Sequence, residues 1–201
     1  MDGTLVLHTS EFDCAHDELR YETYAKVVGK LLNDEIRKEF NSLYEQKGTN
    51  SAVFVSLGLP SDYWQKHFNT LSEEKFYKPE PKIFGTLERL KDIIPISLFT
   101  NAQLSKVRKT FEVVKLNPNW FTHIISGDDI KTPKPSVEGF LLMVERTGIP
   151  AQQILYVGDR VKGEIIPARS VGVQTALMWS ELPEADYSFK NFEDILTLFP
   201  K

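Results

Sequence analysis

The sequence predicts an α/β protein: a parallel sheet flanked by helices, with a small helical bundle inserted near the start of the chain. After residue 79, short apolar runs alternate with helix-like segments. The preceding block lacks such runs and instead repeats apolar residues every three or four positions. Strands that alternate with helices form parallel sheets covered on both faces. We therefore expect an α/β core from residues 1–10 and 79–201, and a helical domain from residues 11–78.

The block 11–78 is expected to form helices without a strand of its own. Gly48 and the stretch 58–61 separate its helical segments, because glycine and proline interrupt helices. The first of these segments has apolar residues at helical spacing: Tyr21, Tyr24, Ala25, Val28, Leu31 and Leu32. The aromatic residues of this block are interpreted as core packing rather than as a ligand site.

In the second half, strands are expected at 94–99, 123–126, 154–157 and 174–178, because each is a short apolar run. Helices are expected at 83–92, 103–115, 137–147, 164–170 and 192–198. In a sheet of this kind, ligands gather at the carboxyl ends of the strands. Residues that follow these strands are therefore the first candidates for a functional site.

The bulk properties narrow the class of protein. A formal net charge of -4 gives no general attraction to nucleic acid or to an anionic membrane. Cys14 is the single cysteine, so the chain cannot form an internal disulfide, which favours a reducing compartment. The sequence shows no signal peptide and no apolar run of the ~20 residues that a membrane helix needs. We expect a cytoplasmic protein; its oligomeric state is not readable.

Four short polar segments stand at the expected strand ends: 2–4, 100–101, 134–135 and 158–159. Each alone is an ordinary turn, loop or helix cap. Together they supply carboxylates for a hard cation such as Mg²⁺, a threonine hydroxyl for phosphate oxygens, and a lysine to balance negative charge. This combination predicts a phosphoryl-transfer site.

In order along the chain, these segments resemble the four motifs of the haloacid dehalogenase-like hydrolase superfamily. Asp2-Gly3-Thr4 resembles the end of the first motif, 98–101 the second, 134–136 the third, and 157–159 with Glu164 the fourth. The resemblance covers essentially the whole chain. It implies a Rossmann-like core and a helical (C1-type) cap domain inserted after the first motif.

The resemblance implies a catalytic role for several residues. Asp2 would protonate the leaving group and then activate water. Thr100 and the Asn101 N–H would orient the phosphoryl group, and Lys134 would hold the nucleophile and the phosphate together. Lys131 is a nearby alternative cation, but Lys134 precedes the motif proline.

The resemblance also implies a Mg²⁺ site built from Asp2, Asp159 and Glu164. The Asp2 backbone carbonyl and Asp159 would be ligands, and Glu164 would steady the waters of the metal. The implied activity is Mg²⁺-dependent hydrolysis of a small phosphorylated metabolite through an aspartyl-phosphate. Dehalogenases of this superfamily carry an aromatic residue at the position of Asp2, because a halide leaves without a proton, so Asp2 favours a phosphatase or phosphomutase.

The nucleophilic aspartate implied by the resemblance would stand immediately before Met1. Three hypotheses follow from its position outside the sequence. The chain is a shortened phosphatase, or a non-catalytic module that binds a phosphorylated ligand, or, less in keeping with Asp2, a phosphomutase or 2-haloacid dehalogenase variant. Shortening is favoured, since a sheet that loses a central strand exposes backbone donors and acceptors.

Overall fold

The computed structural model describes residues 1–7, 9–71 and 75–199. The chain divides into two compact units: a core unit, Met1–Leu7 with Tyr77–Lys201, and a helical unit, His8–Phe76. The sequence placed the boundaries after residues 10 and 78. The first boundary falls earlier because the first helix already begins at Ser10, with Thr9 as its N-cap.

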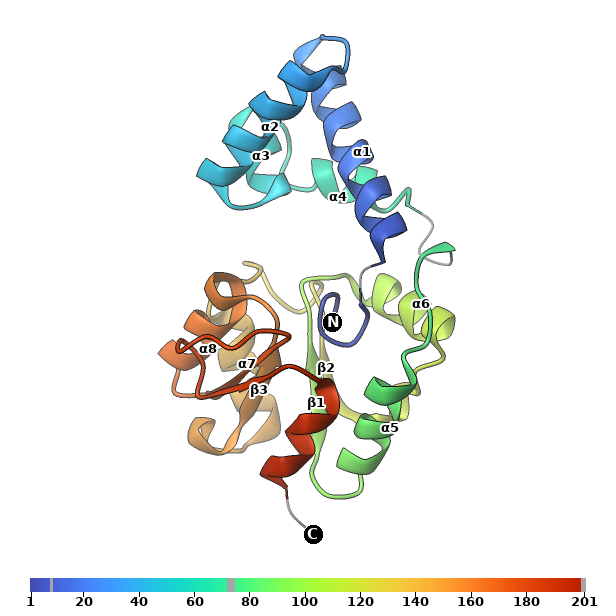
Figure 1. The fold of residues 1–201 in the computed structure, drawn as a ribbon. Helices are drawn as coiled ribbons and strands as arrows, with labels where there is room; N and C mark the ends of the chain where they lie inside the picture. Colours follow the sequence, from blue (N-terminus) through green and yellow to red (C-terminus); the bar gives the residue numbers. More distant parts are fainter. Residues whose placement is uncertain (8, 72–74, 200–201) are drawn as a thin grey trace. The chain divides into compact units, whose positions relative to one another are not determined.

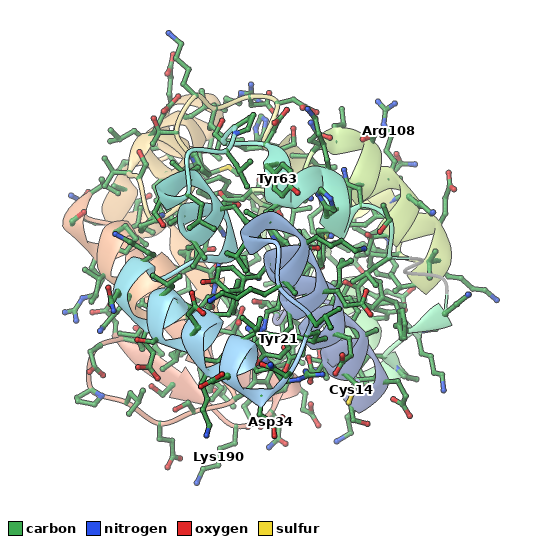
Figure 2. All side chains as sticks on the ribbon, turned by 90° about the horizontal axis from the view of Figure 1, so that it is seen from above. Cys14, Tyr21, Asp34, Tyr63, Arg108 and Lys190 are labelled. Carbon is green, nitrogen blue, oxygen red and sulfur yellow. The ribbon has the colours of Figure 1, made fainter. Side chains whose placement is uncertain are left out.

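The helical unit is built from α1 (Ser10–Val28), α2 (Asp34–Lys47), α3 (Asn50–Ser56) and α4 (Tyr63–Phe68). The Thr9 hydroxyl accepts the Phe12 N–H at 3.2 Å, which satisfies one free donor at the start of α1. The expected aromatic core is present in the described part: Phe54 stacks on Trp64 with ring centroids 5.7 Å apart. Cys14 lies exposed on α1 (Figure 2).

The core unit alternates helices and strands, as Figure 1 shows. Its strands are β1 (Ile96–Phe99), β2 (Phe121–Ile125), β3 (Leu155–Gly158), β4 (Gln174–Met178) and β5 (Tyr187–Phe189). Its α-helices are α5 (Pro81–Leu90), α6 (Leu104–Val114), α7 (Glu138–Thr147) and α8 (Ile166–Ser170). Helix α7 packs against β1 and β2, and α8 packs against β4. Within the described segments, no helix has both the length and the apolarity that a membrane crossing requires.

Every strand pair is parallel, as expected, but the pairing forms two separate ladders, β1–β2 and β3–β4–β5. Residues Met1 to Val6 form a tight turn rather than a strand, because the N–H groups of Thr4, Leu5 and Val6 all donate to the Met1 carbonyl. Among the described residues, therefore, no ladder joins β1 to β3.

Three local features of the core unit differ from the sequence expectation. The expected helix 164–170 starts as a π-helical turn, Val161–Ile165, in which the Ile165 N–H reaches back to the Arg160 carbonyl. The expected helix 192–198 is a 3₁₀ helix, Phe192–Leu198. Strand β5 was not expected, because its short segment lies among polar residues and pairs only along one side of β4.

Two helical glycines offer a test of close packing in the core unit. A Cβ on Gly139 of α7 would overlap the Phe99 ring, whereas a Cβ on Gly85 of α5 would meet nothing within 4 Å. We expect Gly139→Ala to lower the free energy of unfolding by about 1–3 kcal/mol, because a packed aromatic must move. The control, Gly85→Ala, should raise it by about 0.5–1 kcal/mol through reduced chain entropy. Urea denaturation measures both; equal effects of the two substitutions would contradict the close contact.

Candidate functional site

The polar residues predicted from the strand ends lie together in the core unit. Direct contacts link these residues: Lys134 pairs with Glu164, Glu164 accepts the Asp159 N–H, and Asp159 accepts the hydroxyl of Thr4, two positions after Asp2. The structure thus brings together residues that are far apart in the sequence.

A buried ion pair between Lys134 and Glu164 lies within this cluster. The Lys134 Nζ lies 2.5 Å from Glu164 Oε1, and their side chains are only 2% and 3% exposed. The Tyr156 hydroxyl bridges the pair: it accepts from Lys134 Nζ at 2.9 Å and donates to Glu164 Oε1 at 3.0 Å. Lys131, the alternative cation of the sequence analysis, is exposed, whereas Lys134 is buried in this cluster.

The electrostatics of the pair follow from its burial. Burial alone would raise the pKa of Glu164, but the charge of Lys134, reinforced by the Met1 amino group and Arg160, outweighs it and lowers that pKa to about 2. Burial lowers the pKa of Lys134, and Glu164 opposes this change. Glu164 is therefore a carboxylate throughout the physiological range.

Local backbone geometry explains how Glu164 reaches the lysine. Strand β3 ends at Gly158, and the π-helical turn that follows carries Glu164 back over this strand end. Its second oxygen, Oε2, accepts the Asp159 N–H at 3.2 Å. A Cβ on Gly158 would lie 2.8 Å from the same oxygen, so a larger residue there would displace the carboxylate.

Asn101 fixes the loop that carries Lys134. Its side-chain amide donates to the Lys134 carbonyl at 3.1 Å and accepts the Lys134 N–H at 2.8 Å. The Lys134–Pro135 peptide bond is cis. Thr100, the last residue before Asn101, is buried, and its hydroxyl accepts the Ala102 N–H at 3.2 Å. The end of β1 and the loop after β2 are thereby tied together.

Asp159 holds the turn that carries Asp2. The Thr4 hydroxyl donates to Asp159 Oδ1 at 2.8 Å. Gly3 has a positive φ of 78° and lies so close to the Asp159 carboxylate that a Cβ would overlap it. On the other side, the Trp179 indole N–H donates to the Gly3 carbonyl at 2.7 Å. The turn is thus held by two residues distant in sequence.

The expected metal residues differ in what they can offer a hard cation. Asp159 brings its carboxylate to the turn that carries Asp2, where the Asp2 backbone carbonyl is the other expected ligand. The Asp2 carboxylate oxygen Oδ1 is buried, and no hydrogen-bond partner for it lies among the described residues. Glu164, by contrast, is occupied by Lys134, Tyr156 and the Asp159 N–H. In the described part of the chain, no three acidic, histidine or cysteine side chains gather as a metal-binding group. The donor set fits Mg²⁺, which takes one or two carboxylates and keeps several waters.

The sequence did not predict the contacts of Tyr156 and Trp179 in this cluster, nor the structural role of the Asn101 side chain. Tyr156 was interpreted only as part of a buried strand, and Trp179 was not considered. Asn101 was expected to contribute its backbone N–H, whereas its side chain makes the two bonds to Lys134. A tyrosine two positions before the Gly158-Asp159 turn was the available signal, since a buried hydroxyl needs a polar partner.

Fold and site together define a parallel α/β protein that places carboxylates, a threonine and a buried lysine at the carboxyl ends of its strands. Its sequence matches the family model described as haloacid dehalogenase-like hydrolase over residues 1–178. The chain therefore belongs to the haloacid dehalogenase-like hydrolase family, as its motifs predicted.

Similar proteins include two phosphatases and a solved structure. The chain is 29% identical over 142 residues to a phosphoglycolate phosphatase of Escherichia coli, covering 66% of this chain and 55% of that protein. It is 27% identical over 116 residues to a glyceraldehyde 3-phosphate phosphatase of Methanocaldococcus jannaschii, covering 55% and 50%. The match thus spans about half the length of these relatives. A HAD phosphatase structure from Thermococcus onnurineus superposes with a TM-score of 0.69 at 20% identity, covering 98% of this chain and 94% of the other.

The pH dependence of stability tests the ion pair. The pKa of Glu164 is lowered from an ordinary value of 4.5 to about 2 on folding. The carboxylate therefore stabilises the fold above about pH 5, and this contribution is lost as the pH falls towards 2. We expect Glu164→Gln to be less stable than the wild type by about 3 kcal/mol at pH 7, with the difference shrinking through this window.

Urea denaturation at a series of pH values measures this difference. Glu145→Gln, at an exposed position on α7, is the control and should keep the wild-type pH dependence. A Glu164→Gln difference that stays constant from pH 7 to pH 3 would show that the pair does not act as described.

Proposed function

We propose that this site hydrolyses the phosphomonoester of a small metabolite with Mg²⁺. The supporting observation is the series of contacts that links Lys134 to Glu164, Glu164 to Asp159, and Asp159 to the turn that carries Asp2. A phosphate dianion needs fixed positive charge, and the reaction needs an acid whose proton reaches the leaving oxygen. The cluster offers both.

Asp2 is the proposed acid and base. A carboxylate nucleophile, expected at the residue that would precede Met1, attacks phosphorus, and the bond from phosphorus to the ester oxygen breaks. Asp2 gives its proton to that oxygen, which leaves as an alcohol. Asp2 then takes a proton from water, whose oxygen attacks the aspartyl-phosphate and releases inorganic phosphate. The buried, unbonded Oδ1 of Asp2 supports this role, because no protein group competes for it among the described residues.

Thr100, Asn101 and Lys134 are the proposed phosphate-binding groups. Thr100 follows β1 directly, and the Asn101 side chain holds the Lys134 backbone through two hydrogen bonds. With its side chain used in this way, Asn101 keeps its backbone N–H for a phosphate oxygen. A lysine held in place from both its backbone and its ammonium loses little freedom when phosphate binds.

Asp159 and Asp2 are the residues proposed to hold Mg²⁺, through the Asp159 carboxylate and the Asp2 backbone carbonyl. When bound, the cation offsets the negative charge of the phosphate and of the carboxylates around it. Glu164 contributes indirectly, because its contacts with the Asp159 N–H and Lys134 fix both neighbours.

The proposed substrate class is a phosphate monoester with a short carbon chain. The E. coli and M. jannaschii relatives are named for phosphoglycolate and glyceraldehyde 3-phosphate. Phosphate release from a panel that contains both compounds, larger sugar phosphates and nucleoside monophosphates would identify the preferred member.

Hydrolysis of an aryl phosphate with Mg²⁺ tests the proposed chemistry. A chain in which an apolar segment ending in aspartate is joined to Met1 should turn over. Asp2→Asn in that chain should lower kcat by at least 10³-fold, because the leaving group then receives no proton. The 201-residue chain alone should show almost no turnover.

Two matched variants complete this test. Replacing the added aspartate with asparagine should abolish turnover, while Asp128→Asn, at a different aspartate of the core unit, should leave it unchanged. Robust Mg²⁺-dependent hydrolysis by the 201-residue chain would contradict the assigned nucleophile. Tight binding of phosphorylated ligands without turnover in the extended chain would favour the non-catalytic binding module instead.

A further inference from the structure

Trp179 has a backbone conformation that a large side chain rarely adopts. It follows β4 directly and has a φ of 67°, in the left-handed region. Such a conformation is disfavoured for a non-glycine residue and persists only where surrounding contacts enforce it. The contacts of Trp179 must therefore offset the cost of this backbone conformation.

Three contacts hold Trp179 in place. Its backbone N–H donates to the Phe189 carbonyl at 2.7 Å, next to the pairing of β4 with β5. Its ring stacks on Phe192 with centroids 6.4 Å apart and an interplanar angle of 27°. Its indole Nε1–H donates to the Gly3 carbonyl at 2.7 Å, across 176 positions of sequence. The left-handed backbone directs the indole towards the opening turn.

The bond to Gly3 acts on a compact backbone unit, because the N–H groups of Thr4, Leu5 and Val6 all donate to the Met1 carbonyl. From the core, side chains hold it at two adjacent residues: Asp159 accepts the Thr4 hydroxyl, and Trp179 binds the Gly3 carbonyl. Asp2 is covalently joined to Gly3, and its own Oδ1 has no hydrogen-bond partner in the described chain. The direction of the Asp2 carboxylate therefore depends on how its backbone is fixed.

We propose that Trp179 is a positioning residue for Asp2: its indole N–H fixes the Gly3 peptide and so aims the acid/base carboxylate. Trp179 acts through Gly3 rather than by touching the reacting atoms. The inference rests on the proposed function for the role of Asp2, but the hydrogen bond itself can be tested without turnover.

The test compares Trp179→Phe with two matched variants. Phenylalanine keeps an aromatic ring beside Phe192 but has no N–H donor. Phe192→Leu removes the stacked ring while leaving the indole N–H, and so separates packing from hydrogen bonding. Trp120→Phe removes a tryptophan from the 3₁₀ turn Pro118–Trp120, outside the site.

The first readout is amide hydrogen exchange of Gly3 and Thr4, whose N–H groups donate to Val6 and Met1. In Trp179→Phe we expect these two amides to exchange at least 10-fold faster than in wild type, relative to the amides of β4. Phe192→Leu should change all core amides in proportion to its loss of stability, and Trp120→Phe should leave Gly3 and Thr4 unchanged. Wild-type exchange at Gly3 and Thr4 in Trp179→Phe would overturn the proposal, as would acceleration shared equally by β4.

The second readout is the split between kcat and KM in aryl phosphate hydrolysis by the chain extended before Met1. Trp179→Phe should lower kcat about 10-fold with little change in KM. An unchanged kcat would overturn the positioning role even if exchange is faster. If the extended wild type itself does not turn over, the proposed function fails, and the exchange readout alone then decides whether Trp179 fixes the turn.

Discussion

The arrangement of the site depends on one buried ion pair, Lys134 with Glu164. Removing two charges from water is costly, and the cost is recovered only with close geometry and additional hydrogen bonds. Here Tyr156 supplies such bonds to both partners, and the Asp159 N–H binds the second oxygen of the carboxylate. Because Glu164 extends from the turn after β3 and Lys134 from the loop after β2, the pair joins the two ladders where no backbone pairing does so in the described chain.

Side-chain contacts also hold the opening turn, Met1 to Val6, in place. Asp159 and Trp179, both distant from the turn in sequence, hold it by hydrogen bonds to Thr4 and Gly3. Asp159 therefore accepts the hydrogen bond of Thr4 and also places a negative charge beside the turn that carries Asp2. A change at Asp159 would alter both the charge of the site and the position of the turn.

The elements were predictable from sequence, but the contacts among the predicted site residues were not. Apolar runs predicted β1 to β4 to within about two residues, because buried parallel strands have an unambiguous pattern. Lys134, Asp159 and Glu164 were predicted by motif. The pairing of Lys134 with Glu164 joins positions 30 apart, and the bond from Trp179 joins positions 176 apart. Neither local propensity nor periodicity reports such contacts. The π-helical turn was missed for a related reason, since its conformation serves the burial of Glu164 rather than any local preference.

The ion pair is compatible with the phosphate binding that we propose for Lys134. A lysine ammonium has three N–H donors. Glu164 and Tyr156 accept two of them, and the ammonium also lies 4.7 Å from the centroid of the Phe99 ring, whose face favours a cation. These hydrogen bonds leave one donor, and the negative charge of Asp159 also acts on the ammonium. The contacts that bury the lysine thus fix its direction, and a phosphate oxygen would complete its hydrogen bonding rather than replace an existing partner. The contacts that stabilise buried Lys134 would therefore also orient it for the proposed phosphate.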